Sequence, residues 1–142
     1  TASYEEQELV PYAELIGSGG ADSVMTAHVI NRNIDPEYPA TLSEKFIKEI
    51  LRQNLGFDGV VFSDDMQMGA IVDNYGFEDA IVRAINAGCD VLILSNNGAE
   101  YDDSVARRAR DIILQAVLDG QISESRINES YARIIKMKEK LK

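Results

Sequence analysis

The sequence predicts an α/β protein built from parallel β/α units. Short apolar strands alternate with amphipathic helices along the 142 residues of the chain, and each strand is apolar on both faces, as strands of parallel sheets are. The clearest strand, residues 59–63, runs directly into the adjacent carboxylates Asp64 and Asp65. Ligands and catalytic groups gather at the carboxyl ends of such strands. This acidic pair is therefore a candidate functional site.

The amino-terminal part of the chain predicts a helix, a strand and a loop. Apolar residues recur at helical spacing in residues 5–16, and a glycine-rich break follows them. Residues 23–30 (SVMTAHVI) predict the first strand. The Asn, Asp and two Pro residues of 31–40 (NRNIDPEYPA) resist regular structure and predict a loop.

The middle of the chain predicts a second helix and the second strand. Thr41, followed three residues later by a glutamate, forms a possible capping box, although Ser43 could cap the helix instead. Gly56 ends this helix. The strand of residues 59–63 comes next, and we expect a loop over residues 69–75.

The carboxyl-terminal part predicts a third strand between helices. Apolar periodicity predicts a helix over residues 77–87, which Gly88 ends. Residues 90–94 (DVLIL) form the third strand, and helices over 103–119 and 124–141 follow. The expected order of elements is α-β-α-β-α-β-α-α.

Three such strands make a poor independent sheet, because parallel strands need helices on both faces or a closed barrel. The chain is therefore expected to contribute consecutive units to a larger barrel or doubly wound sheet, with the remaining units upstream of Thr1. Right-handed crossovers would place the strands side by side in chain order, with His28 and Asp64 at the same end of the sheet.

Composition excludes several classes of function. A net charge of −10 disfavours nucleic acid or an anionic membrane surface as a partner. The single cysteine, Cys89, excludes an internal disulfide and is expected to be a small buried side chain. No apolar run approaches the length of a membrane span, and no signal peptide is visible.

Four segments together resemble one family. They are SVMTAHVI, DPEYPATLSEKFIKEILRQNLGFDGVVFSDDMQMGAI, AINAGCDVLILSN and RINESYARIIKMKEKL. The succession resembles the catalytic barrel of family-three glycoside hydrolases, specifically the β-N-acetylhexosaminidase branch, from about residue 8 onward. The resemblance implies that residues 1–142 are the carboxyl-terminal part of a TIM-type (β/α)8 barrel, with its last three β/α units and a preceding helix.

The resemblance implies a role for Asp64. In the family, the aspartate directly after the Ser or Thr at the end of this strand is the nucleophile that forms a covalent glycosyl-enzyme intermediate. A retaining glycosidase needs such an ionised carboxylate about 5 Å from its acid/base partner. Asp65 is then a neighbour, and capping or holding the following turn is the alternative role of both carboxylates.

His28 and Met66 are candidate substrate-binding residues. His28, the only histidine, would by itself be interpreted as a satisfied strand-end histidine. The resemblance implies that its strand end lines the sugar pocket, so that His28 shapes or hydrogen-bonds the sugar. Met66 and Met68 fit packing better than chemistry, although Met66 could form an apolar wall for the sugar.

The chain departs from the family in what it lacks. The family carries, earlier in the barrel, a lysine-histidine segment that binds the sugar and an aspartate-histidine acid/base pair, and neither motif occurs here. We therefore expect the chain alone to be inactive, and to self-associate or to pair with the missing half of the barrel. The resemblance implies a glycan substrate containing N-acetylglucosamine, no cofactor or metal, and a bacterial role in peptidoglycan turnover, either cytoplasmic or exported.

Three alternatives stay open. A phosphoryl-accepting receiver domain also has a strand-end acidic pair, but it would need that pair on its first strand and a third aspartate on a later one. A metal-dependent hydrolase could use Asp64, Asp65 and His28, but adjacent strand residues point to opposite faces. A non-catalytic barrel remnant that binds a partner is the third possibility.

Overall fold

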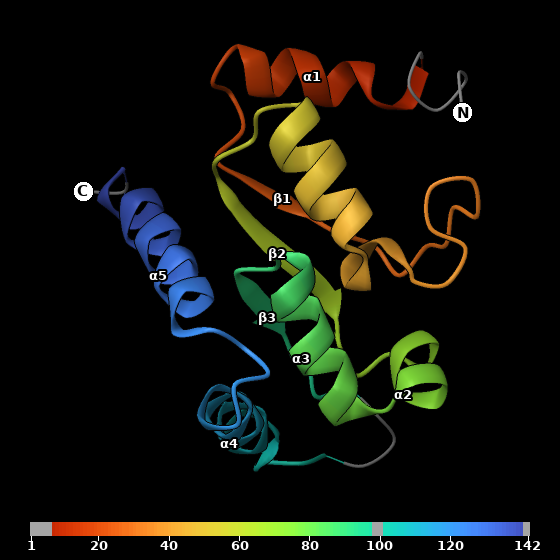
Figure 1. Ribbon diagram of the computed structural model, residues 1–142, viewed down its shortest axis with the longest axis vertical. Helices are drawn as coiled ribbons and strands as arrows, with labels where there is room; N and C mark the ends of the chain where they lie inside the picture. Colours follow the sequence, from red (N-terminus) through yellow and green to blue (C-terminus); the bar gives the residue numbers. More distant parts are fainter. Residues whose placement is uncertain (1–6, 98–100, 141–142) are drawn as a thin grey trace.

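The computed structural model describes residues 7–97 and 101–140. The elements follow in the order α1 (Val10–Gly17), β1 (Ser23–Met25), η2 (Ala40–Leu42), η3 (Lys45–Asn54), β2 (Val60–Asp65), α2 (Gly69–Tyr75), α3 (Phe77–Ala87), β3 (Val91–Ile93), α4 (Val105–Leu118) and α5 (Glu124–Glu139) (Figure 1). None of the described helices is both long and apolar enough to cross a lipid bilayer.

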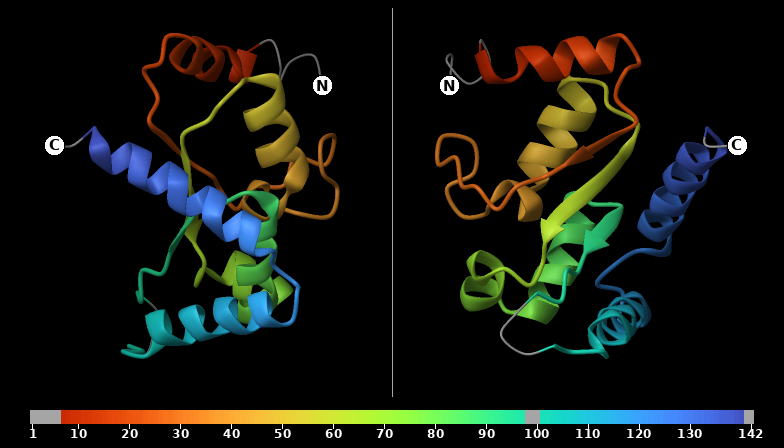
Figure 2. Two further views of the ribbon diagram at one scale, coloured as in Figure 1. Left: turned by 60° about the vertical axis from the view of Figure 1, so that its left-hand side comes forward. Right: turned by 180° about the vertical axis from the view of Figure 1, so that it is seen from behind.

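The three strands form one parallel sheet in the order β1-β2-β3, which confirms the predicted adjacency and direction. Seen from behind, η3 and α3 lie across the far side of the strands, and α5 runs alongside the sheet (Figure 2). The main core lies between β2 and these helices and includes Leu42, Ile47, Val61, Met66, Ala80 and Ala84. A second cluster joins α3 to α4.

Several elements differ from the expected ones. The first strand ends at Met25 and not at residue 30, since its ladder to β2 stops where Met25 pairs with Phe62. The expected loop over residues 69–75 is the helix α2, whose residue Ile71 is fully buried. A glycine at the first position lowers local helix propensity, so tertiary packing of Ile71 outweighs it.

The helices around the second strand also depart from expectation. The Thr41 capping box does not form, because Thr41 is buried and bonds other side chains. The Ser43 hydroxyl accepts a hydrogen bond from the Phe46 amide at 3.4 Å, as the alternative cap. The helix η3 is π-helical. At its end the Leu55 amide donates a hydrogen bond to the carbonyl of Ile50, five residues earlier. Residues 5 and 6 of the predicted helix over 5–16, and residue 141 of the predicted helix over 124–141, lie outside the described part of the chain.

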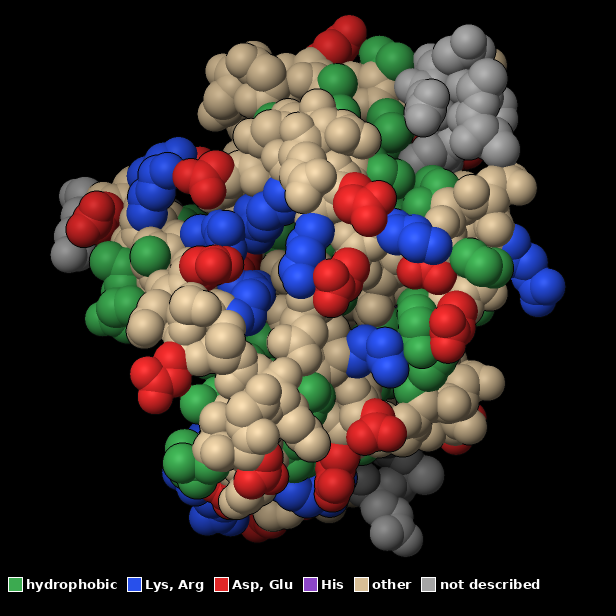
Figure 3. Space-filling model, in the orientation of Figure 1, with side chains coloured by type: hydrophobic (Ala, Val, Ile, Leu, Met, Phe, Trp, Pro, Cys, Tyr) green, Lys and Arg blue, Asp and Glu red, His purple; other side chains and the backbone are tan. Residues whose placement is uncertain are grey.

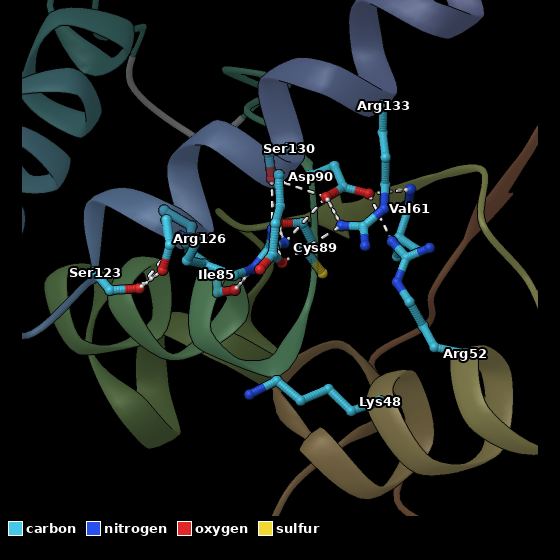
Figure 4. A network of polar contacts seen from close by, with 12 residues as sticks. Lys48, Arg52, Val61, Ile85, Cys89, Asp90, Ser123, Arg126, Ser130 and Arg133 are labelled. Atoms are coloured by element: carbon cyan, nitrogen blue, oxygen red, sulfur yellow. Dashed lines mark hydrogen bonds and ion pairs between the residues drawn. The ribbon is translucent and has the colours of Figure 1, made fainter.

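A buried ionic network attaches α5 to the amino end of β3 (Figure 4). The Asp90 carboxylate is fully buried and accepts hydrogen bonds from Arg52, Arg126, Arg133, Ser130 and the Val61 amide. Figure 3 shows the face of the molecule on which α5 lies. Lys and Arg side chains gather across the middle of that face, over and beside α5, with acidic groups among them. The network lies at the end of the sheet opposite the acidic pair, so it stabilises the fold away from the candidate site.

Candidate active site

The candidate site forms at the carboxyl ends of the three strands. His28 follows β1, Asp64 and Asp65 end β2, and Ser95 follows β3. The His28 Nε2 atom lies 2.8 Å from the Asp65 carbonyl oxygen, so His28 and the acidic pair share one end of the sheet, as predicted.

The register between β2 and β3 shifts by one residue between Phe62 and Asp65, an interval that contains Asp64. Phe62 pairs with Val91 and Asp65 pairs with Ile93, so β2 contains one more residue than β3 in this interval. The Ile93 amide donates a hydrogen bond to the Ser63 hydroxyl at 2.9 Å. Bulges redirect side chains and occur beside active sites. Asp64 lies within this irregular interval.

The Asp65 carboxylate is occupied by hydrogen bonds within the protein. It accepts from the Ser95 amide and the Gln67 amide, each at 3.1 Å, and from the Ser95 hydroxyl at 2.5 Å. Burial disfavours the charged form, but these hydrogen bonds outweigh it and hold the pKa of Asp65 below its usual range. Asp65 therefore joins the end of β2 to the loop after β3.

The Asp64 carboxylate has much less to hold it. Among the described residues its one hydrogen bond is with the adjacent Asp65 amide, which donates to Oδ1 at 2.8 Å. The side chain is only partly buried. Its second oxygen can therefore meet an incoming reactant without breaking a hydrogen bond to the described part of the protein.

Both ring nitrogens of His28 are already engaged. Nδ1 lies 3.0 Å from the Thr41 hydroxyl, and Nε2 lies 2.8 Å from the Asp65 carbonyl oxygen. Thr41 is fully buried and bonds in turn to the Thr26 hydroxyl at 3.0 Å. In this arrangement the ring has no free nitrogen to offer a ligand.

The two methionines that follow the pair lie in different surroundings. Met66 is 0% exposed and belongs to the main core, whereas Met68 is 44% exposed. This placement favours packing for Met66 over direct contact with a ligand.

Sequence reasoning missed Thr26, Thr41, Ser95 and Gln67 as members of this site. The position of Ser95 directly after a strand was the available signal for it. The Gln67 amide bonds to Asp65 only two residues away, so the turn-forming tendency of aspartate was the signal for that contact. The Thr26 and Thr41 contacts join residues 13 to 36 positions apart, and no local pattern encodes them. The described residues contain no group of three or more His, Cys, Asp or Glu side chains able to hold a metal ion.

The sequence and the structure are similar to known proteins. The family profile described as "Glycosyl hydrolase family 3 N terminal domain" matches residues 1–137. A protein of Tolumonas auensis named "Beta-hexosaminidase" is 42% identical over 95 residues, which are 67% of this chain and 28% of that protein. A protein of the same name from Mannheimia succiniciproducens is 44% identical over 91 residues, 64% of this chain and 26% of that protein.

Solved structures agree with the sequence relatives. A family 3 beta-N-acetylglucosaminidase from Paenibacillus sp. str. FPU-7 superposes with a TM-score of 0.83 and 40% identity, over 93% of this chain and 24% of that one. CbsA from Thermotoga neapolitana gives a TM-score of 0.83 at 32% identity, over 93% of this chain and 28% of that one. The chain thus spans about a quarter of the length of these relatives. Because the family profile matches residues 1–137 of the 142 residues, the chain belongs to glycosyl hydrolase family 3.

Proposed function

We propose that this chain supplies the nucleophile-bearing part of a retaining β-N-acetylhexosaminidase. In this proposal β1, β2 and β3 are the last three strands of a (β/α)8 barrel. The names of the relatives support the activity, and the parallel sheet supports the fold. The observation that carries the proposal is the contrast at the end of β2, where both Asp65 oxygens accept hydrogen bonds and one Asp64 oxygen accepts none from the described residues.

The proposed reaction uses Asp64 as a carboxylate. One Asp64 oxygen attacks the anomeric carbon of a terminal N-acetylglucosamine as the bond to the leaving oxygen breaks, and an acid protonates that oxygen. Water then hydrolyses the glycosyl ester, with the same acid/base group removing a proton from the water. The hydrogen bond from the Asp65 amide orients the Asp64 carboxylate for this attack.

The acid/base group of the proposed enzyme belongs to β/α units that these 142 residues do not include. The non-catalytic, partner-binding alternative has less support, since the sequence relatives are named as enzymes. The sugar would be attached to a muropeptide, a chitin oligomer or another glycan.

Covalent labelling tests the role of Asp64. The chain is produced joined to the remaining units of the barrel and treated with a mechanism-based fluorosugar related to N-acetylglucosamine. We expect the label on Asp64, no label in Asp64→Asn, and a label that persists in Asp65→Asn. Peptide mass spectrometry reads the site, and a label carried by Asp65 would overturn the assignment.

Activity of the 142-residue chain tests the need for the other units. We expect no hydrolysis of an aryl N-acetylglucosaminide, because general acid catalysis contributes about 10²–10⁴-fold and the matching motif is missing. Release of the aryl group is followed by absorbance, with Asp64→Asn as the blank. Turnover that depends on Asp64 would contradict the proposed division of the catalytic groups.

A further inference from the structure

A chain of side-chain hydrogen bonds runs from β1 to the end of β2. The Thr26 hydroxyl bonds to the Thr41 hydroxyl at 3.0 Å, Thr41 bonds to His28 Nδ1 at 3.0 Å, and His28 Nε2 reaches the Asp65 carbonyl oxygen at 2.8 Å. The Thr26 hydroxyl also lies 3.2 Å from the Phe62 carbonyl oxygen. This relay therefore links the loop after β1, the short helix η2 and the strand that carries Asp64.

The acceptor at the end of this relay fixes the proton on the histidine. A backbone carbonyl oxygen can only accept, so His28 Nε2 must carry the hydrogen in that contact. In the neutral ring Nδ1 then accepts from the Thr41 hydroxyl, which in turn accepts from Thr26. The Thr26 hydroxyl has one hydrogen and two acceptors within reach, the Thr41 hydroxyl and the Phe62 carbonyl oxygen. When that hydrogen points to Thr41, each hydroxyl of the relay donates once.

The imidazole takes the place of a strand partner. The backbone ladder between β1 and β2 ends with the Thr26 amide, which donates to the Phe62 carbonyl oxygen at 2.9 Å. Three residues further along β2, the His28 ring supplies the donor for the Asp65 carbonyl oxygen. On the opposite side, β3 holds the same segment, because the Met66 amide donates to the Ile93 carbonyl oxygen at 3.0 Å.

We propose that His28 is a positioning residue. Thr41 orients the His28 ring, and the ring holds the end of β2 so that the Asp64 carboxylate keeps its direction. The catalytic part of this inference rests on the proposed role of Asp64. His28 acts through the Asp65 backbone, and its ring nitrogens do not bind the sugar. Thr41 is well suited to orient the ring, because it is fully buried and its carbonyl accepts a 3.6 Å hydrogen bond from the Cys89 thiol.

Nuclear magnetic resonance on the 142-residue chain tests the arrangement without any activity. The chain has one histidine, so ring signals are unambiguous. We expect a ring Nε2 proton protected from solvent exchange, with a coupling across the hydrogen bond to the Asp65 carbonyl carbon. Thr41→Ser should keep this signal and Thr41→Val should broaden it. Absence of the protected proton from the unsubstituted chain would overturn the proposal, and that measurement requires no variant.

Kinetics of the chain joined to the remaining barrel units test the positioning role. Removing the ring with His28→Ala should lower kcat about 10–100-fold, since a displacement of about 1 Å can cost 10²-fold, while KM changes less than about threefold. His28→Gln, which can again donate to the Asp65 carbonyl, should recover part of kcat. A large rise in KM at unchanged kcat would overturn the proposal by making His28 a sugar ligand. Fluorosugar labelling away from Asp64 would instead refute the proposed function and leave the ring-proton result standing.

Discussion

Asp64 and Asp65 are neighbours with identical side chains, yet the structure uses their carboxylates differently. Within the described part of the chain, Asp65 accepts two hydrogen bonds from Ser95, after β3, and one from Gln67, whereas Asp64 accepts one from the next amide. Hydrogen bonds to a carboxylate stabilise its charged form and restrict its movement. These hydrogen bonds suit a structural role for Asp65, and the sparser bonding of Asp64 is what the proposed nucleophile requires.

The different hydrogen bonding predicts different effects of substitution. Asp65→Asn should lower the free energy of unfolding by about 1–3 kcal/mol, because the Ser95 hydroxyl and two amides lose a charged acceptor. The matched variant Asp64→Asn should cost less than about 1 kcal/mol, since its single bond is local. Urea unfolding of the 142-residue chain measures both. Equal losses would contradict the assignment of a structural role to Asp65 alone.

At the scale of elements, apolar runs in the sequence located the strands well. Tertiary packing determined helix α2 and the contacts of His28, which the sequence did not predict. Val60 and Val61 are 0% exposed, and this burial is what the unbroken apolar run predicted. The sequence did not predict helix α2, because the helix is stabilised by burial of Ile71. Local apolar periodicity does not mark it. The partners of His28 could not be predicted, because the Thr41 and Asp65 contacts depend on how the segments approach one another. The strand end carrying Asp64 was predictable, whereas the surroundings that distinguish it from Asp65 were not.

Helix α5 depends on the buried carboxylate of Asp90. Burial disfavours the charge of Asp90, but hydrogen bonds from the Val61 amide, Ser130 and Arg126, together with the charge of Arg52, hold the pKa of Asp90 below its usual range. Asp90→Asn should cost about 3–5 kcal/mol, because it leaves largely buried arginines without their anion. Asp58→Asn, at an exposed ion pair with Lys136, should cost less than about 1 kcal/mol. Urea unfolding measures the free energy of unfolding of both variants, Asp90→Asn and Asp58→Asn.

The same network predicts an acid dependence of stability. The pKa of Asp90 is lower in the folded chain than in the unfolded chain. The contribution of Asp90 to the free energy of unfolding is therefore fully present above the unfolded pKa of about 3.9, and it is lost as the pH falls through the folded-state pKa. Unfolding at pH 7, 4 and 2.5 should therefore show a steeper loss for the unsubstituted chain than for Asp90→Asn. Parallel pH profiles would contradict the role of this carboxylate.

At the scale of the whole molecule, both outer strands have apolar surroundings and one strand partner each in the described sheet. An apolar groove beside β1 includes Met25 and Val29, which are 62% and 63% exposed. A second groove, between β3, α4 and α5, includes Leu114 and Tyr131, which are 56% and 65% exposed. A closed barrel pairs every strand edge, whereas an open edge offers unpaired backbone groups to another chain.

These open edges predict that the 142-residue chain associates with itself. Association should be detectable by light scattering at roughly 100 μM and should strengthen with salt, because a net charge of −10 makes copies repel and ions screen that repulsion.

The double variant Leu114→Lys and Tyr131→Lys should weaken this self-association by placing charges in the groove beside β3. Since these lysines reduce the net negative charge, a weaker association cannot come from greater overall repulsion. Leu118→Lys is the matched control, being on the same helix, 72% exposed and outside that groove. A chain that remains monomeric at high salt would show that its edges are protected without a partner.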